Sequence, residues 1–163
     1  MLWDTHMHTH FSGDSDADPT KMARAAIARN LDGICITDHL DYDYPDDPDL
    51  FIIDFTQYKK EIGQLQSDFS DSLKINYGIE LGLQPHLAAR HHELLQTEDF
   101  DFVIGSSHVV HGIDPYYPVY YEGRTESAAY LEYFESILEN ILAFDEFDVY
   151  GHIDYVVRYG PHK

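Results

Sequence analysis

The sequence predicts an α/β fold, a parallel sheet or barrel flanked by helices, from three observations. Short apolar stretches of strand length alternate with longer stretches at helical spacing throughout the chain. The 163 residues are 44% hydrophobic, which suffices for one domain with its own core, and they contain no repeat or linker. Residues of metal-ligand type stand where the predicted strands end. Strands that alternate with helices are typical of parallel sheets and barrels.

The first strand and the first helix follow from their local sequence. Residues 3–8, WDTHMH, alternate in the manner of a strand with two different faces. Asp18 and Pro19 are typical of an N-cap and a first helical residue, and the helix formers of 21–30 continue the helix.

The middle of the chain continues the alternation. The short apolar run 33–37, GICIT, predicts a buried strand. The acidic, proline-broken stretch 41–49, DYDYPDDPD, predicts a loop. A helix is expected over 55–69, because apolar residues recur there every three or four positions on one face. These residues are Tyr58, Ile62, Leu65 and Phe69.

The second half repeats the same order, with one aromatic loop inserted. The expected elements are a strand at 74–80, a helix at 86–96, a strand at 100–108, a tyrosine- and proline-rich loop at 112–123, a helix at 126–144 and a strand at 147–153.

The charge balance excludes some classes of partner. The chain has 30 acidic and 10 basic residues, which gives a formal net charge of −20 at pH 7. Nucleic-acid binding needs Lys and Arg, so no nucleic-acid partner is expected, whereas divalent cations suit this charge. No stretch approaches the roughly 20 apolar residues of a membrane helix, and no signal peptide precedes the first strand. The single Cys35 predicts a small buried side chain and a reducing, cytoplasmic location.

The opening stretch, MLWDTHMHTHF, suggests a metal site. Asp4, His6, His8 and His10 stand two residues apart, so in a strand their side chains would all point to one face. Three imidazoles and a carboxylate on one face are typical of metal binding. His10 stays open between a metal ligand and a supporting hydrogen-bond partner.

The ends of the predicted strands carry a more specific signal. Parallel barrels build their active sites at the carboxyl ends of their strands. Imidazole and carboxylate together favour zinc, iron or manganese over calcium or magnesium. Asp14 follows the first strand, and we interpret it as a further ligand rather than only a solvated turn. The residues at the strand ends are His6, His8, Asp38, His39, Glu80, His108 and His152.

A cluster of two or three divalent transition metal ions suits phosphate-ester hydrolysis. A carboxylate such as Glu80 can bridge two cations with its two oxygens. Such metals neutralise phosphoryl oxygens, convert water to hydroxide near neutral pH and stabilise the leaving oxygen. Arg158, six residues beyond His152, is a candidate for two-point contact with a phosphate or carboxylate, with a surface charge as the alternative.

The remaining histidines and the aromatic loop have plainer interpretations. The loop 116–121 stays open between a substrate lid and core packing. The histidines of the 86–96 helix lack the second His of an HExxH zinc motif, so we expect them at the surface. His111 is expected in a loop and His162 in a frayed tail. The helical histidines are His86, His91 and His92.

Five motifs taken in order resemble the polymerase and histidinol phosphatase (PHP) superfamily. They are DTHMHTHFSGD, ITDH, YGIELG, IGSSHVV and YGHIDYVVRYGP. Within that superfamily, GIELGLQPH, FVIGSSHVVHGIDPYYP and GHIDYVVRYGP are most similar to monofunctional histidinol-phosphate phosphatases. The resemblance extends over essentially the whole chain.

This resemblance implies a distorted, TIM-like, seven-stranded β/α barrel with a trinuclear metal site. It also implies hydrolysis of L-histidinol phosphate to L-histidinol and phosphate in histidine biosynthesis, through a metal-bound hydroxide. Matching positions imply His6, His8 and Glu80 for one metal, Glu80, His108 and His152 for a second, Asp14 and His39 for a third, and Arg158 with His39 for the substrate.

One feature departs from the family pattern. The family closes its cluster with an Asp-x-His near the end of the barrel, and no such motif follows Gly105. A barrel of about 250 residues is typical, so the chain is expected to form roughly the first two-thirds of one, truncated at its C-terminus. The open barrel edge would favour homo-oligomers. The alternatives are another PHP phosphoesterase, acting on phosphotyrosine or nucleotides, and a catalytically silent metal-binding fragment.

Overall fold

The computed structural model describes residues 1–45 and 47–162, and it contains every strand and helix expected from the sequence. The strands are β1 (Trp3–Met7), β2 (Gly33–Ile36), β3 (His39–Leu40), β4 (Lys74–Gly82), β5 (Phe102–Ser106) and β6 (Val149–Tyr150). The helices are α1 (Pro19–Ala28), α2 (Phe55–Asp68), α3 (Ala88–Thr97), α4 (Glu126–Ala143) and α5 (Tyr155–Tyr159), with short 3-10 helices η1 (Pro85–Leu87) and η2 (Pro118–Tyr121). The two-residue strand β3 and the short α5, η1 and η2 were not predicted.

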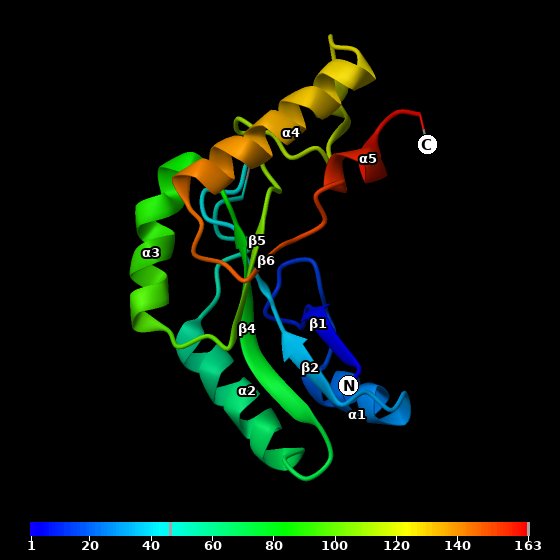
Figure 1. Ribbon diagram of the computed structural model, residues 1–163, viewed down its shortest axis with the longest axis vertical. Coiled ribbons are helices and arrows are strands. Elements are labelled where there is room, and N and C mark those ends of the chain that lie inside the picture. Colours follow the sequence, from blue (N-terminus) through cyan, green and yellow to red (C-terminus); the bar gives the residue numbers. More distant parts are fainter. Residues whose placement is uncertain (46, 163) are drawn as a thin grey trace.

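The strands form a curled, parallel half-barrel. Their order is β1-β2-β4-β5-β6, and β3 pairs with the second half of β4. All the pairings are parallel, so the carboxyl ends of the strands lie at one end of the sheet. Figure 1 shows α2, α3 and α4 along one side of this sheet, with the C-terminal α5 beyond the ends of β5 and β6.

The main core lies between the sheet and the helices that cover it. All four residues of β2 are buried, including Cys35, as expected from the apolar run. Helix α2 buries Tyr58, Ile62 and Leu65 on the face that the sequence indicated. The Tyr58 hydroxyl also donates a hydrogen bond to the carbonyl of Gly78, 2.9 Å away. Burial of each large apolar side chain contributes roughly 1.5–3 kcal/mol, and this core therefore holds the strand ends in register.

The first strand is shorter than the alternating pattern suggested. β1 ends at Met7, and the chain turns away because buried Asp38 accepts hydrogen bonds from the hydroxyls of Thr9 (2.8 Å) and Ser12 (3.0 Å). As a consequence, Nε2 of His10 lies 3.5 Å from Oε2 of Glu61 on α2, away from the other histidines of the first strand. We expected one strand face to carry Asp4, His6, His8 and His10, and this was wrong for the residues that follow Met7, where β1 ends.

The two predicted loops contain no α-helix or strand among their described residues, although the second includes the 3-10 helix η2. Residues 41–45 and 47–49 form bends and turns, and residue 46 of the expected acidic loop lies outside the described residues. The aromatic loop divides between the two interpretations: Tyr120 is buried, whereas Tyr116 and Tyr117 line a cavity. In the part of the chain that the structure describes, no helix has the length and apolarity needed to span a bilayer.

Candidate metal centre

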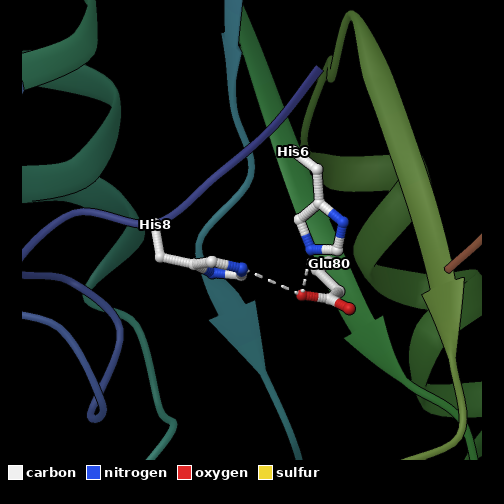
Figure 2. Close-up of side chains that lie close together, drawn as sticks. All are labelled: His6, His8 and Glu80. Carbon is white, nitrogen blue, oxygen red and sulfur yellow. Dashed lines mark hydrogen bonds and ion pairs between the residues drawn. The ribbon is translucent and has the colours of Figure 1, made fainter. Parts of the chain in front are cut away.

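Glu80 occupies the centre of the site. It lies near the end of β4, fully buried, and its register partners are His39 on β3 and Ile104 on β5. One carboxylate oxygen, Oε2, lies 2.9 Å from His6 Nε2 and 3.4 Å from His8 Nε2. Figure 2 shows these two imidazoles converging on that single oxygen.

The second oxygen of Glu80 faces a different pair of histidines. Oε1 lies 2.9 Å from His152 Nε2 and 3.3 Å from His108 Nε2. It also accepts a hydrogen bond from the Ser106 hydroxyl at 2.6 Å. The two carboxylate oxygens therefore serve two groups of imidazoles, the arrangement that a carboxylate bridging two cations requires.

Four overlapping groups of side chains place their ligand atoms within 4.8 Å of one another. Every residue that the family resemblance assigned to a metal belongs to one of them, whereas Asp4, His10 and Asp38 belong to none of these groups of described residues. The groups are His6, His8 and Glu80; Glu80, His108 and His152; His8, Asp14 and His39; and His39, Asp41 and His108.

The electrostatics of the centre reflect buried carboxylates surrounded by imidazoles. Burial alone would raise the pKa of Glu80, but the neighbouring His39 and His108 hold it well below its ordinary value. Conversely, burial would lower the pKa of His108, but Asp41 and Glu80 raise it well above its usual value. The buried negative charge therefore requires positive charge beside it, which protons on imidazole or bound cations can supply.

The residues fit a bound metal. His108 Nε2, His39 Nδ1 and Asp41 Oδ2 are buried and lack a hydrogen-bond partner among the described residues. His39 Nδ1 lies 3.3 Å from Asp41 Oδ2, and His108 Nε2 lies 3.3 Å from Glu80 Oε1, in each case without the geometry of a hydrogen bond. Buried polar atoms without hydrogen bonds are costly, and a cation beside them would offset this cost. Imidazole nitrogens and carboxylate oxygens together are ligands for zinc and neighbouring transition metals.

Asp41 is a buried residue of the site that the sequence analysis did not identify. Its Oδ1 lies 2.7 Å from His108 Nδ1, and its Oδ2 lies 3.3 Å from His39 Nδ1. A signal was available, since Asp41 follows His39 by two residues in extended chain, which places both side chains on one face. Asp41 packs directly on Gly82: a Cβ atom there would lie 2.0 Å from Asp41 Oδ1.

The centre forms one wall of a cavity of about 890 Å³. Arg158 also lines this cavity, as does Asp14, whose Oδ2 lies 3.7 Å from His39 Nε2. The rest of the wall is largely aromatic and includes Tyr44, Phe51, Tyr116, Tyr117, Tyr155 and Tyr159.

The histidines assigned to other roles lie away from the centre. His86, His92, His111 and His162 are exposed and contact carboxylates outside the cavity. His91 contradicts the expectation of a surface residue: it is fully buried, with Nε2 3.2 Å from the carbonyl of Gly82. Its ring lies between those of Tyr42 and Phe144, with centroid separations of 5.6 and 5.5 Å.

The fold and the site together define a class: a parallel α/β half-barrel with a histidine and carboxylate cluster at the carboxyl ends of its strands. The PHP domain family model matches residues 4–163, and the chain belongs to this family.

Two curated relatives cover nearly the whole chain. The histidinol-phosphatase of Lactococcus lactis subsp. lactis (strain IL1403) is 36% identical over 160 residues, which are 98% of this chain and 59% of that protein. A protein named probable histidinol-phosphatase from Clostridium acetobutylicum is 32% identical over 99% of this chain and 61% of its own length. The chain thus spans about three-fifths of each relative.

A solved structure shares the fold. The crystal structure of the histidinol phosphate phosphatase from Lactococcus lactis, complexed with zinc, L-histidinol and phosphate, superposes with a TM-score of 0.94. That match has 36% sequence identity and covers 99% of this chain and 61% of the other.

Proposed function

We propose that this chain forms the metal-binding portion of a phosphomonoester hydrolase that converts L-histidinol phosphate to L-histidinol and phosphate, as a cytoplasmic enzyme of histidine biosynthesis. One observation carries the proposal: the two oxygens of buried Glu80 face two separate groups of histidines at the wall of a large cavity. Oε2 faces His6, His8 and His39, and Oε1 faces His108 and His152. The relative that was crystallised with zinc, L-histidinol and phosphate supports the choice of substrate.

The ligand assignment keeps the sets implied by the sequence. His6, His8 and Glu80 would hold one metal, Glu80, His108 and His152 a second, and Asp14 with His39 a third. Bound zinc, iron or manganese ions would neutralise phosphoryl oxygens and lower the pKa of a coordinated water.

The side chains of this chain would position these groups and the substrate. Asp41 fixes the ring of His108 through Nδ1, so that Nε2 faces the centre. The Ser106 hydroxyl fixes Glu80 by its hydrogen bond to Oε1. Arg158, which also lines the cavity, offers a planar guanidinium that suits two-point contact with a phosphate.

We also propose that the chain self-associates, at the open edge of its sheet and along an apolar stripe on α4. β6 is the last strand in the sheet order, so one of its edges has no neighbouring strand among the described residues. Helix α4 also has a row of exposed apolar side chains next to the face that it buries. Leu131 and Leu138, for example, are 60% and 58% exposed. Such a stripe favours contact with a second copy. The stripe consists of Leu131, Phe134, Leu138, Ile141 and Leu142.

The test of the enzymatic proposal begins with elemental analysis of the purified chain, followed by reconstitution and assay with L-histidinol phosphate. The expected result is two or more transition metal ions per chain and release of phosphate. A chain that binds metal without turnover of any phosphomonoester would instead be the silent metal-binding fragment. Preferential hydrolysis of phosphotyrosine or nucleotides would favour the other phosphoesterase alternative. His108→Ala with full metal content and turnover would contradict the ligand assignment.

A further inference from the structure

Asp114 is a buried carboxylate of the cavity wall that the metal centre does not use. It is only 4% exposed, yet it contributes to the lining of the cavity. Its Oδ2 accepts a hydrogen bond from the Tyr44 hydroxyl at 2.7 Å. Its Oδ1 accepts two, from the Tyr155 hydroxyl at 3.0 Å and from the backbone N–H of Tyr116 at 2.7 Å.

These contacts leave one hydrogen-bond acceptor position of the Asp114 carboxylate unused. An ionised carboxylate offers about four lone-pair positions, and three donors occupy three of them, so one position on Oδ2 stays open. All three donors are neutral groups, two phenols and one amide. The buried negative charge therefore has hydrogen bonds but no cation among these partners, and a cation entering the cavity would find both charge and a free acceptor there.

Tyr155 fixes the position of Asp114 relative to the metal centre. The Tyr155 ring packs against His108 and His152, with centroid separations of 5.7 and 5.5 Å. The hydroxyl at the far end of the same ring contacts Asp114. One tyrosine ring thus lies between the carboxylate and two of the ligands assigned to the second metal.

The surrounding side chains suit an organic cation. Tyr116 and Tyr117 form an edge-to-face pair with centroids 5.1 Å apart, and Tyr159 packs edge-to-face on both Tyr116 and Tyr155. Aromatic faces attract ammonium and similar groups. The cavity therefore has two chemically different ends: imidazoles and carboxylates that suit metals and phosphate, and a carboxylate among aromatic rings.

We propose that Asp114 binds the protonated amine of the substrate while its phosphate lies at the metal centre, and so selects amino-alcohol phosphates over phosphomonoesters without a cation. The inference rests on the proposed function for the position of the phosphate. L-Histidinol phosphate carries its amine on the carbon next to the one bearing the phosphate ester, so the two groups would enter the same cavity together.

Direct binding tests this role without requiring turnover. The probes are L-histidinol and imidazole-4-propanol, which has the same alcohol and imidazole but no amine, titrated calorimetrically into the metal-reconstituted chain. We expect the chain to prefer L-histidinol by about tenfold or more, as a charge-assisted hydrogen bond allows. Asp114→Asn, which keeps the shape and loses the charge, should remove this preference. Asp43→Asn, which removes an exposed carboxylate outside this cavity, should retain it.

Each other outcome overturns the proposal. Equal binding of the two alcohols by the unmodified chain, or no binding of either, contradicts the role and needs no variant. A preference that persists in a folded Asp114→Asn protein would come from contact of the amine with metal and would also contradict it. Failure of the proposed function is separate: a chain that turns over no phosphomonoester but shows the Asp114-dependent preference loses the hydrolase assignment and keeps the amine site.

Discussion

The Oδ1 atom of Asp41 lies 2.7 Å from Nδ1 of His108, and both side chains are buried. Asp41 thereby leaves Nε2 as the only ring nitrogen of His108 that faces Glu80 and the centre. Histidine ligands are commonly oriented in this way by a carboxylate on their far nitrogen. The position of one imidazole is therefore set from a loop that follows β3, 67 residues earlier in the chain.

Replacing Asp41 should weaken metal binding without removing a proposed ligand of the three metals. Asp41→Asn keeps the size of the side chain but loses the charge that stabilises the oriented ring. We expect metal affinity to fall by about tenfold to a hundredfold, measured by competition with a chromophoric chelator. Asp43→Asn is the matched control, because Asp43 is exposed and forms its ion pairs with His86 and Arg90, outside the centre. Equal affinities of the two variants would contradict the positioning role.

The ligand-type residues at the strand ends could be predicted from the sequence, whereas the supporting residue Asp41 was missed although its two-residue spacing from His39 was a signal. His6, Glu80, His108 and His152 were placed together because the carboxyl ends of parallel strands meet at one end of a sheet. Asp41 was missed because it begins an acidic, proline-broken stretch whose composition indicates a solvated loop. Its partner His108 is distant in sequence, and only the tertiary fold brings the two together.

The burial of His91 shows where a local pattern was misread. Leu87, His91 and Leu94 recur at helical spacing, and all three are buried on one face. The histidine content of the helix masked this apolar periodicity. For β1 the periodic pattern was trusted too far. The two-residue spacing of the histidines continues in the sequence after the strand has ended at Met7, so the predicted strand was too long.

The buried His91 should make folding stability depend on pH. Burial lowers its pKa from 6.5 to about 4. The unfolded chain therefore takes up a proton that the folded chain excludes, so this contribution is fully present above pH 6.5 and is lost as the pH falls through 4. The maximum loss is about 3 kcal/mol.

His91→Gln removes this titration while it keeps a donor for the Gly82 carbonyl. Urea unfolding of the metal-free chain from pH 7 to 4 should show a flatter pH profile for this variant than for the unmodified chain. His92→Gln, at the adjacent exposed position, should leave the profile unchanged. Superimposable slopes for all three proteins would show that His91 does not contribute.

The apolar stripe on α4 should control self-association. Leu138 is 58% exposed in the middle of the stripe, so Leu138→Glu places a charge there without disturbing the buried face of the helix. We expect light scattering to show oligomers of the unmodified chain at micromolar concentration and a larger monomer fraction for the variant. Glu135→Gln, exposed on the same helix, is the control. A monomeric unmodified chain would contradict self-association through this surface.

Two glycines give opposite predictions for the same substitution. A Cβ at Gly82 would lie 2.0 Å from Asp41 Oδ1, so Gly82→Ala must displace the carboxylate that orients His108. We expect reduced metal affinity together with a lower free energy of unfolding. Gly63 lies within α2 and has no atom within 4 Å of its added Cβ, so Gly63→Ala should stabilise the chain by roughly 0.5–1 kcal/mol.

Comparing Gly82→Ala with Gly63→Ala separates a local effect on metal binding from the general effect of replacing a glycine. Urea unfolding measures stability for both variants, and chelator competition measures metal affinity. If Gly82→Ala binds metal as tightly as Gly63→Ala, Asp41 can shift without consequence and does not position His108. If only Gly82→Ala loses metal, the close packing of β4 on Asp41 is a requirement of the centre, because the glycine leaves the space that the carboxylate fills.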